Sequence, residues 1–198
     1  YAAYAFSGYV DDIADELTDT SEQRALMDEA RRRLRECRNG EREGPLFTAL
    51  GWAFDTFDIP DEFFEELVNG VEMDFTMSRY ETWADLLAYM DGSAAVIGEM
   101  MLPVLRPGTD AVTPARALGL AFQLTNFLRD VGEDLDRGRV YVPQEDLRRF
   151  GADPHARVVT PEWRALMAFE IERNRRLYRE ADDGIPALPG ASRRCVAT

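Results

Sequence analysis

One segment, residues 118–134, constrains the fold more than any other part of the sequence. Within it Asn126, Asp130 and Asp134 are spaced four residues apart, and because an α-helix turns once every 3.6 residues they would lie on one face. The rest of the segment is mostly apolar, with Leu118, Leu120, Ala121, Phe122, Leu124, Phe127 and Leu128. Carboxylates against a buried surface need a counter-charge, and oxygen ligands at this spacing suit a hard cation such as Mg²⁺. For this segment alone, a solvated acidic helix face is an equally good interpretation.

A second acidic cluster near the start of the chain favours the cation site. Asp11 and Asp15 are again four residues apart, Asp12 lies close to the same face, and an aromatic-rich run at residues 1–10 precedes them. Two helices that each bring an aspartate pair to a common cavity could hold several Mg²⁺ ions and clamp a diphosphate between them. We therefore expect metal-assisted ionisation of a phosphorylated leaving group.

Helical periodicity and turn signals predict helices throughout the chain. The expected ranges are about 1–17, 22–38, 45–57, 61–69, 83–105, 113–134, 143–150 and 161–181. Ser21 is the expected N-cap of the second helix, and Gly70 and Gly151 are expected to end the fourth and the seventh. No segment has the pattern of a strand, an internal repeat or a linker between domains. The predicted fold class is all-α, a bundle around a central cavity.

Length and charge limit the class of protein. A chain of 198 residues with a formal net charge of −14 is large enough for one domain with a substantial core. Its acidity argues against binding to nucleic acid and against simple electrostatic attachment to an anionic membrane. An anionic substrate would need a bridging cation.

Cysteine and histidine usage adds a prediction of compartment. Cys37 and Cys195 form neither a disulfide framework nor a zinc site, and the single histidine, His155, is expected on the surface in a loop. The sequence has no signal peptide and no apolar run of transmembrane length. We expect a cytoplasmic protein that takes up a lipid substrate by peripheral contact with a membrane.

Further motifs connect these clusters to a known family. They are Arg79-Tyr80-Glu81-Thr82, residues 119–134 and Arg137-Gly138-Arg139-Val140-Tyr141-Val142-Pro143. Together with the two aspartate clusters, they make the chain resemble the squalene/phytoene synthases, and bacterial phytoene synthases most of all. The resemblance implies an isoprenoid synthase-type helical bundle. Compared with the family the chain lacks a helix at each end, so we expect one isoprenoid synthase domain over residues 1–198 that is incomplete at both ends.

The resemblance also implies roles for individual residues. It assigns binding of Mg²⁺, or of Mn²⁺ in its place, to Asp11, Asp12, Asp15, Asn126, Asp130 and Asp134. It assigns substrate contacts to Tyr4, Tyr89, Gln123, Asn126, Arg129, Arg139 and Tyr141. Catalysis is expected from Asp11, Asp15, Asp130, Asp134 and Arg129, with the arginine neutralising charge on the leaving diphosphate. Gly8 stands where the family usually has an arginine, so one diphosphate contact is expected to be missing.

The implied reaction is the head-to-head condensation of two geranylgeranyl diphosphates, through a cyclopropylcarbinyl diphosphate, to phytoene. No NADPH is expected to take part. A dehydrosqualene or squalene synthase acting on farnesyl diphosphate is the alternative within the same class. A non-catalytic assembly factor of the same fold is the alternative outside it. The residue pattern leaves the prenyl chain length and the oligomeric state open.

Overall fold

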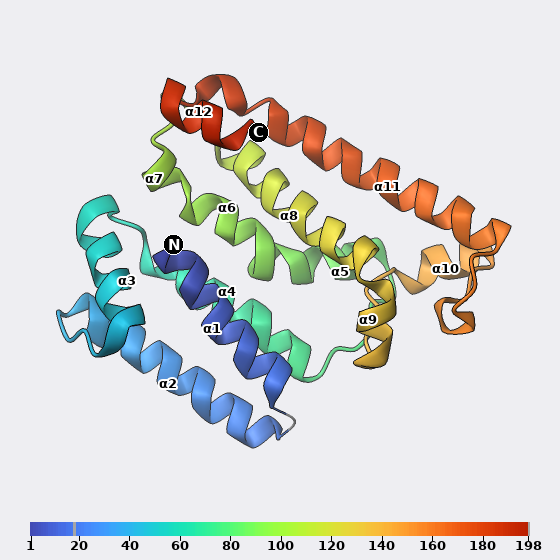
Figure 1. Ribbon diagram of the computed structural model, residues 1–198, viewed down its shortest axis with the longest axis horizontal. Coiled ribbons are helices and arrows are strands. Elements are labelled where there is room, and N and C mark those ends of the chain that lie inside the picture. The colour runs from blue at the N-terminus through green and yellow to red at the C-terminus, as the bar shows by residue number, and fades with distance from the viewer. Residues whose placement is uncertain (18, 198) are drawn as a thin grey trace.

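The computed structural model describes residues 1–17 and 19–197, and the regular structure of this part is helical (Figure 1). The α-helices are α1 (Ala2–Glu16), α2 (Thr20–Arg38), α3 (Gly44–Phe57), α4 (Asp61–Glu72), α5 (Trp83–Met90), α6 (Val96–Met100), α7 (Leu102–Leu105), α8 (Val112–Arg129), α9 (Val131–Asp136), α10 (Gln144–Phe150), α11 (Pro161–Asp182) and α12 (Gly190–Val196). Short 3₁₀ turns are η1 (Met73–Phe75), η3 (Pro154–Ala156) and η4 (Ile185–Ala187), and η2 (Asp91–Ala95) is a π-helical turn. Within the described ranges, the closest approach to a strand is one isolated bridge between Arg79 and Val140. The all-α prediction is confirmed.

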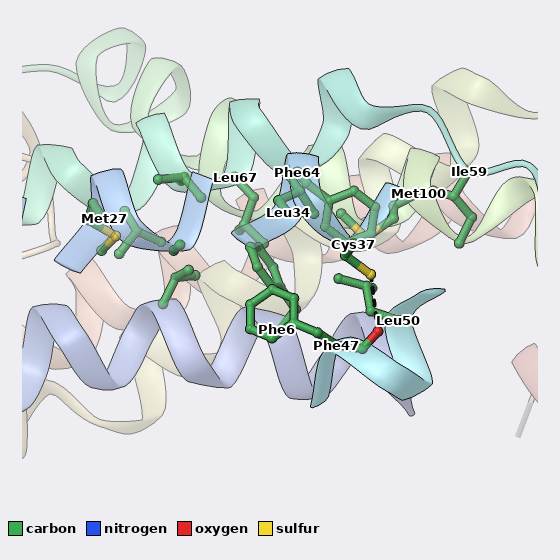
Figure 2. Packing of buried hydrophobic residues seen from close by; sticks show 14 of the residues in the cluster. Phe6, Met27, Leu34, Cys37, Phe47, Leu50, Ile59, Phe64, Leu67 and Met100 are labelled. Atoms are coloured by element: carbon green, nitrogen blue, oxygen red, sulfur yellow. Dashed lines mark hydrogen bonds between the residues drawn. The ribbon is translucent and has the colours of Figure 1, made fainter. Parts of the chain in front are cut away.

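One core holds the N-terminal helices together. Helices α1 to α4 and α6 share a buried cluster in which Phe6, Phe47 and Phe64 meet edge to face, with the Phe6 and Phe64 ring centroids 5.4 Å apart (Figure 2). Such aromatic pairs add to the stabilisation from area burial alone. The side chain of Cys37 is also buried there and donates to the carbonyl of Phe47. This core fixes the apolar face of α1 and leaves its acidic face free.

A second core surrounds α8, which α11 covers along its length (Figure 1). Its members come from α5, α8 and the segments beside them: Tyr80, Leu86, Tyr89, Met90, Ala95, Leu120, Leu124, Phe127 and Tyr141. The backbones approach closely at Gly119, where an added Cβ would lie 2.2 Å from the carbonyl oxygen of Ala94. Helix α8 is therefore pressed directly against the π-helical turn η2.

Two sequence predictions about helix ends are corrected by the structure. Asp19, and not Ser21, caps α2, because its carboxylate accepts from the amides of Ser21 and Glu22 at 2.8 and 3.1 Å. Gly70 does not end α4, which continues to Glu72. A Cβ at Gly70 would lie 2.6 Å from the backbone of Gly92, so this glycine serves a close contact between helices.

The expected long helix over residues 83–105 is interrupted by η2 and again at Met101. The expected central helix is divided at Asp130 into α8 and α9. The predicted end at Gly151, which has a φ of 65°, is confirmed. Among the described residues, no helix combines the length and the apolar character that crossing a bilayer requires.

Candidate active site

The two acidic clusters open onto one cavity of about 250 Å³. Its lining residues are Asp11, Ala14, Asp15, Asp74, Tyr89, Gln123, Asn126, Phe127, Asp130, Asp134, Arg137, Arg139 and Tyr141. They come from α1, η1, α5, α8, α9 and the segment that follows α9. Aspartates that are more than a hundred residues apart in sequence therefore face a shared space.

Helix α1 presents its aspartates because its other positions are buried. Phe6, Val10 and Ile13 recur at helical spacing and are at most 6% exposed. Asp11 and Asp15, four residues apart, then lie together on the face that meets the cavity. The apolar residues of α1 thus determine where its carboxylates point.

The second aspartate cluster keeps its spacing across a change of helix. Asp130 has φ −101° and ψ 15° and separates α8 from α9. The backbone nevertheless continues the helical hydrogen bonds, from the amide of Asp130 to the carbonyl of Asn126 and from that of Asp134 to Asp130, each at 2.9 Å. All three side chains consequently line the same cavity, as the four-residue spacing predicts.

Arginines neutralise two of the aspartates. Asp15 accepts from Nη1 of Arg139 at 2.8 Å and lies 3.4 Å from Nη1 of Arg137. Arg129 binds Asp130 through two nitrogens, at 2.7 and 2.6 Å, and holds the pKa of that carboxyl below its usual range. These ion pairs link α1 to the segment after α9 and fix the end of α8.

Three other carboxyl groups carry no such partner. Burial raises the pKa of Asp11 to about 6, with help from Asp15, Asp74 and Asp12. Burial likewise raises the pKa of Asp74 to about 6. The pKa of Asp134 is also raised to about 6, by burial and then by Asp130. Raised values mean that the cavity resists further negative charge, which is the condition that favours a bound cation.

The residues present fit a hard divalent cation. The donors are carboxylate oxygens and the amide oxygen of Asn126, which Mg²⁺ prefers. In addition, Oδ1 of Asp74 is buried without a hydrogen-bond partner. No three acidic, histidine or cysteine side chains in the described ranges stand close enough together to form a ready ligand set for one ion. Binding would therefore require side-chain rearrangement.

Stacked aromatic rings form one wall of the cavity. The rings of Phe127 and Tyr141 lie 3.8 Å apart and nearly parallel, and Tyr80 and Tyr89 lie 5.2 Å apart beside them. The hydroxyl of Tyr89 donates to Oδ2 of Asp74 at 2.8 Å. Burial raises the pKa of all three tyrosines above the ordinary value, so their phenols stay neutral. The rings of Tyr89, Phe127 and Tyr141 stack on one another and give this side of the cavity an apolar surface.

Several predicted site residues lie elsewhere. The side chain of Tyr4 is 83% exposed and does not line the cavity, although it is on α1 seven residues before Asp11. Asp12 is exposed beside the cavity, and Arg129 points outward to its ion pair with Asp130. His155 is exposed, as expected. The assigned roles of Tyr4, Asp12 and Arg129 remain predictions.

Sequence reasoning missed two residues that line the cavity, Asp74 and Arg137, and also Tyr80, whose buried ring packs against Tyr89 and Tyr141. The signal for Asp74 was a single acidic residue between Met73 and Phe75, which by itself is indistinguishable from a solvated turn. Tyr80 and Arg137 stood within recognised motifs but had no assigned role. Their placement depends on how η1 and the segment after α9 fold back onto α5.

A second cavity, of about 270 Å³, lies farther along α8 and has an apolar lining. Leu118 and Phe122 contribute to it, whereas Gln123 and Asn126 contribute to the acidic cavity. The two groups overlap along the helix axis, because Phe122 and Gln123 are neighbours, and Leu118 lies about 12 Å from Asn126. Helix α8 therefore contributes apolar side chains to one cavity and the polar side chains of Gln123 and Asn126 to the other.

Comparison with known proteins agrees with this geometry. A family model described as squalene/phytoene synthase matches residues 1–198. The chain is 35% identical over 204 residues to the 15-cis-phytoene synthase of Synechococcus elongatus, covering 95% of this chain and 66% of that protein. It spans about half the length of the phytoene synthase of Daucus carota and of phytoene synthase 1 of Solanum lycopersicum, which it also matches.

Two solved structures share the fold. A dehydrosqualene synthase in complex with a ligand has a TM-score of 0.90 and 32% identity, covering 100% of this chain and 70% of that one. The squalene synthase HpnC from Alicyclobacillus acidocaldarius has a TM-score of 0.89 and 33% identity, covering 98% of this chain and 74% of that one. The helical architecture, the paired aspartate clusters and the full-length match to the family model lead to one conclusion: the chain belongs to the squalene/phytoene synthase family.

Proposed function

We propose that this chain forms the catalytic part of a Mg²⁺-dependent prenyltransferase that condenses two geranylgeranyl diphosphates head to head to give phytoene. The observation that carries the proposal is the shared cavity, where α1, η1 and α8–α9 bring together five aspartates, of which three lack an arginine partner. The 35% identity to a 15-cis-phytoene synthase supports the choice of product.

Asp11, Asp15, Asn126, Asp130 and Asp134 would hold the cation, and Asp12 is a further candidate beside the cavity. When bound, Mg²⁺ draws electron density from the diphosphate as its bond to the allylic carbon breaks. Mn²⁺ has the same preference for oxygen ligands and could substitute.

The chain's own residues would do the remaining work. Gln123 and Arg139 line the cavity and can donate hydrogen bonds to diphosphate oxygens. The apolar cavity beside Leu118 and Phe122 suits a prenyl chain. The wall of Tyr89, Tyr141 and Phe127 would keep water from the allylic cation.

The reaction balances without a redox partner. The first diphosphate leaves, the double bond of the second substrate attacks the allylic cation, and loss of one proton closes the ring to give a cyclopropylcarbinyl diphosphate. The second diphosphate then leaves, and rearrangement with loss of one proton gives a conjugated triene. The products are phytoene, two diphosphates and two protons, so NADPH is not required.

Synthesis of dehydrosqualene or squalene from farnesyl diphosphate is the second candidate. It is supported by the likeness to a dehydrosqualene synthase and a squalene synthase among the solved structures. A non-catalytic assembly factor is less well supported, because such a protein has no need to retain both aspartate clusters.

The test is incubation of the protein with geranylgeranyl or farnesyl diphosphate and Mg²⁺, without NADPH, followed by hydrocarbon analysis. Release of a C40 triene would support phytoene synthesis, and a C30 triene would favour the second candidate. The matched variant is Asp134→Asn, which should abolish turnover while the thermal stability is retained. Consumption of neither diphosphate by the wild-type protein would refute the synthase proposal.

A further inference from the structure

Asp15 is the aspartate of α1 that is already bound to cations of the protein itself. Its carboxylate accepts from Arg139 at 2.8 Å, and Arg137 lies 3.4 Å away on the other oxygen. The side chain of Arg139 is 16% exposed and that of Arg137 is 50% exposed. The inner arginine is thus enclosed by the cavity, and the outer one stands at its rim.

These arginines and a divalent cation would compete for Asp15. A carboxylate offers a limited set of lone pairs, and those that face the cavity are directed at the two guanidinium groups. The positive charge of Arg139 also acts on Asp74 and Asp134, whose pKa values it lowers in opposition to burial. A cation entering the cavity would therefore meet both an occupied ligand and a like charge.

The backbone that carries the arginines is held in place by hydrogen bonds that do not involve their side chains. The amide of Arg139 donates to the carbonyl of Asp134, and that of Val140 donates to the carbonyl of Ser78, each at 2.8 Å. Beyond Asp15, Arg137 contacts the carboxylate of Glu133 at 3.2 Å, in an exposed pair that contributes little stability. Rotation of either guanidinium group would leave these backbone hydrogen bonds intact.

Resting on the function proposed above, we propose that Arg139 and Arg137 exchange partners when substrate binds. They release Asp15 to the divalent cation and bind the oxygens of the diphosphate instead. A guanidinium group can donate two parallel hydrogen bonds to such oxygens. The exchange keeps Asp15 and both arginines paired with an opposite charge before and after binding. It also makes binding of the cation and of the diphosphate cooperative, because each removes an obstacle to the other.

The exchange predicts effects of opposite sign in a single variant. Arg139→Gln should bind Mn²⁺ alone about threefold to tenfold more tightly, since an ion pair that competes for Asp15 is gone. The same variant should bind inorganic pyrophosphate in saturating Mn²⁺ about tenfold to a hundredfold more weakly, since a charged hydrogen bond is lost. Arg137→Gln should change both constants in the same directions by smaller factors.

The measurements are Mn²⁺ binding by electron paramagnetic resonance and pyrophosphate binding by calorimetry, on the whole protein. Arg148→Gln is the matched control, because Arg148 pairs with Glu81 away from the acidic cavity and should leave both constants unchanged. Arg139→Lys keeps the charge and should restore part of the pyrophosphate affinity.

Weaker binding of both Mn²⁺ and pyrophosphate by Arg139→Gln would show a structural role and overturn the exchange. Tighter Mn²⁺ binding with unchanged pyrophosphate binding would also overturn it, because the arginine would then be a counter-ion that never reaches the diphosphate. A wild-type protein that binds neither Mn²⁺ nor pyrophosphate would instead refute the proposed function.

Discussion

Replacement of Gly8 by arginine offers a gain of function that can be worked out from the structure. Gly8 lies three residues before Asp11 on α1, about 4.5 Å along the helix axis. A Cβ added there would meet no atom within 4 Å. An arginine can therefore be accommodated without displacing a neighbour, and its stem is long enough to bring the guanidinium toward the acidic cavity.

Two separate effects are expected from Gly8→Arg. Within a helix, arginine is more favourable than glycine by about 0.5–1 kcal/mol, so the free energy of unfolding should rise by that amount. A charged hydrogen bond to the diphosphate would contribute about 1.5–3 kcal/mol, which corresponds to roughly tenfold to a hundredfold in affinity. The exposed Asp12, four residues along the helix, competes for the new guanidinium and offsets about 0.2–0.5 kcal/mol of this gain.

Gly8→Ala separates the two effects, because it gives the helix contribution without the charge. Thermal unfolding should show both variants stabilised by similar amounts. Calorimetry with pyrophosphate in saturating Mn²⁺ should show tighter binding by the arginine variant alone. Equal affinities for the two variants would mean that position 8 does not face the diphosphate, and the placement of the substrate between α1 and α8–α9 would then be wrong.

Other predictions concern titration and packing. Folding raises the pKa of Asp11, Asp74 and Asp134 to about 6, so protons and cations compete for these carboxylates. The affinity for Mn²⁺ should therefore fall steeply below pH 6. Binding of Mn²⁺ near pH 6 should release protons, which calorimetry in buffers of different ionisation enthalpy can measure. The folded state binds these protons more tightly than the unfolded state. Without a cation, the free energy of unfolding should therefore decrease as the pH rises from about 4 to 6 and then level off. The Asp74→Asn variant should therefore have a higher melting temperature than the wild type at pH 7 and the same melting temperature at pH 4, and its turnover should be lower. Equal melting temperatures at pH 7 would contradict the burial of this charge. Gly119→Ala should lower the unfolding free energy by about 1–3 kcal/mol, because its Cβ would lie 2.2 Å from the carbonyl oxygen of Ala94, and an unchanged melting temperature would refute that close approach.

Local patterns predicted much of the fold. The apolar spacing of Phe6, Val10 and Ile13 predicts both that α1 forms and which face it buries. The change of conformation at Gly151, with its φ of 65°, is likewise a property of a few neighbouring residues. The meeting of the aspartate clusters could be predicted because each is a short-range pattern and a bundle brings such faces to one cavity.

Features that depend on tertiary contacts were not predictable from the sequence. A glycine at position 70 suggests the end of a helix from sequence alone. The structure shows instead that the backbone of Gly92, which is distant in sequence, leaves no room for a side chain there. Asp74 has no partner at helical spacing, and it becomes part of the site only because Tyr89 donates to it at 2.8 Å. A long-range contact leaves no periodic pattern in the sequence, so residues placed by such contacts can be identified only from the structure.

The charge balance of the cavity explains why a bound cation should stabilise the folded domain as well as assist the reaction. Five aspartates and two arginines line it, so the folded chain concentrates negative charge that the unfolded chain would disperse. The aromatic core of α1 to α4 must outweigh this repulsion. A divalent cation that binds only the assembled cavity removes the repulsion and stabilises the fold by mass action. Cation binding and the close approach of α1 to α9 are therefore expected to be linked, each favouring the other.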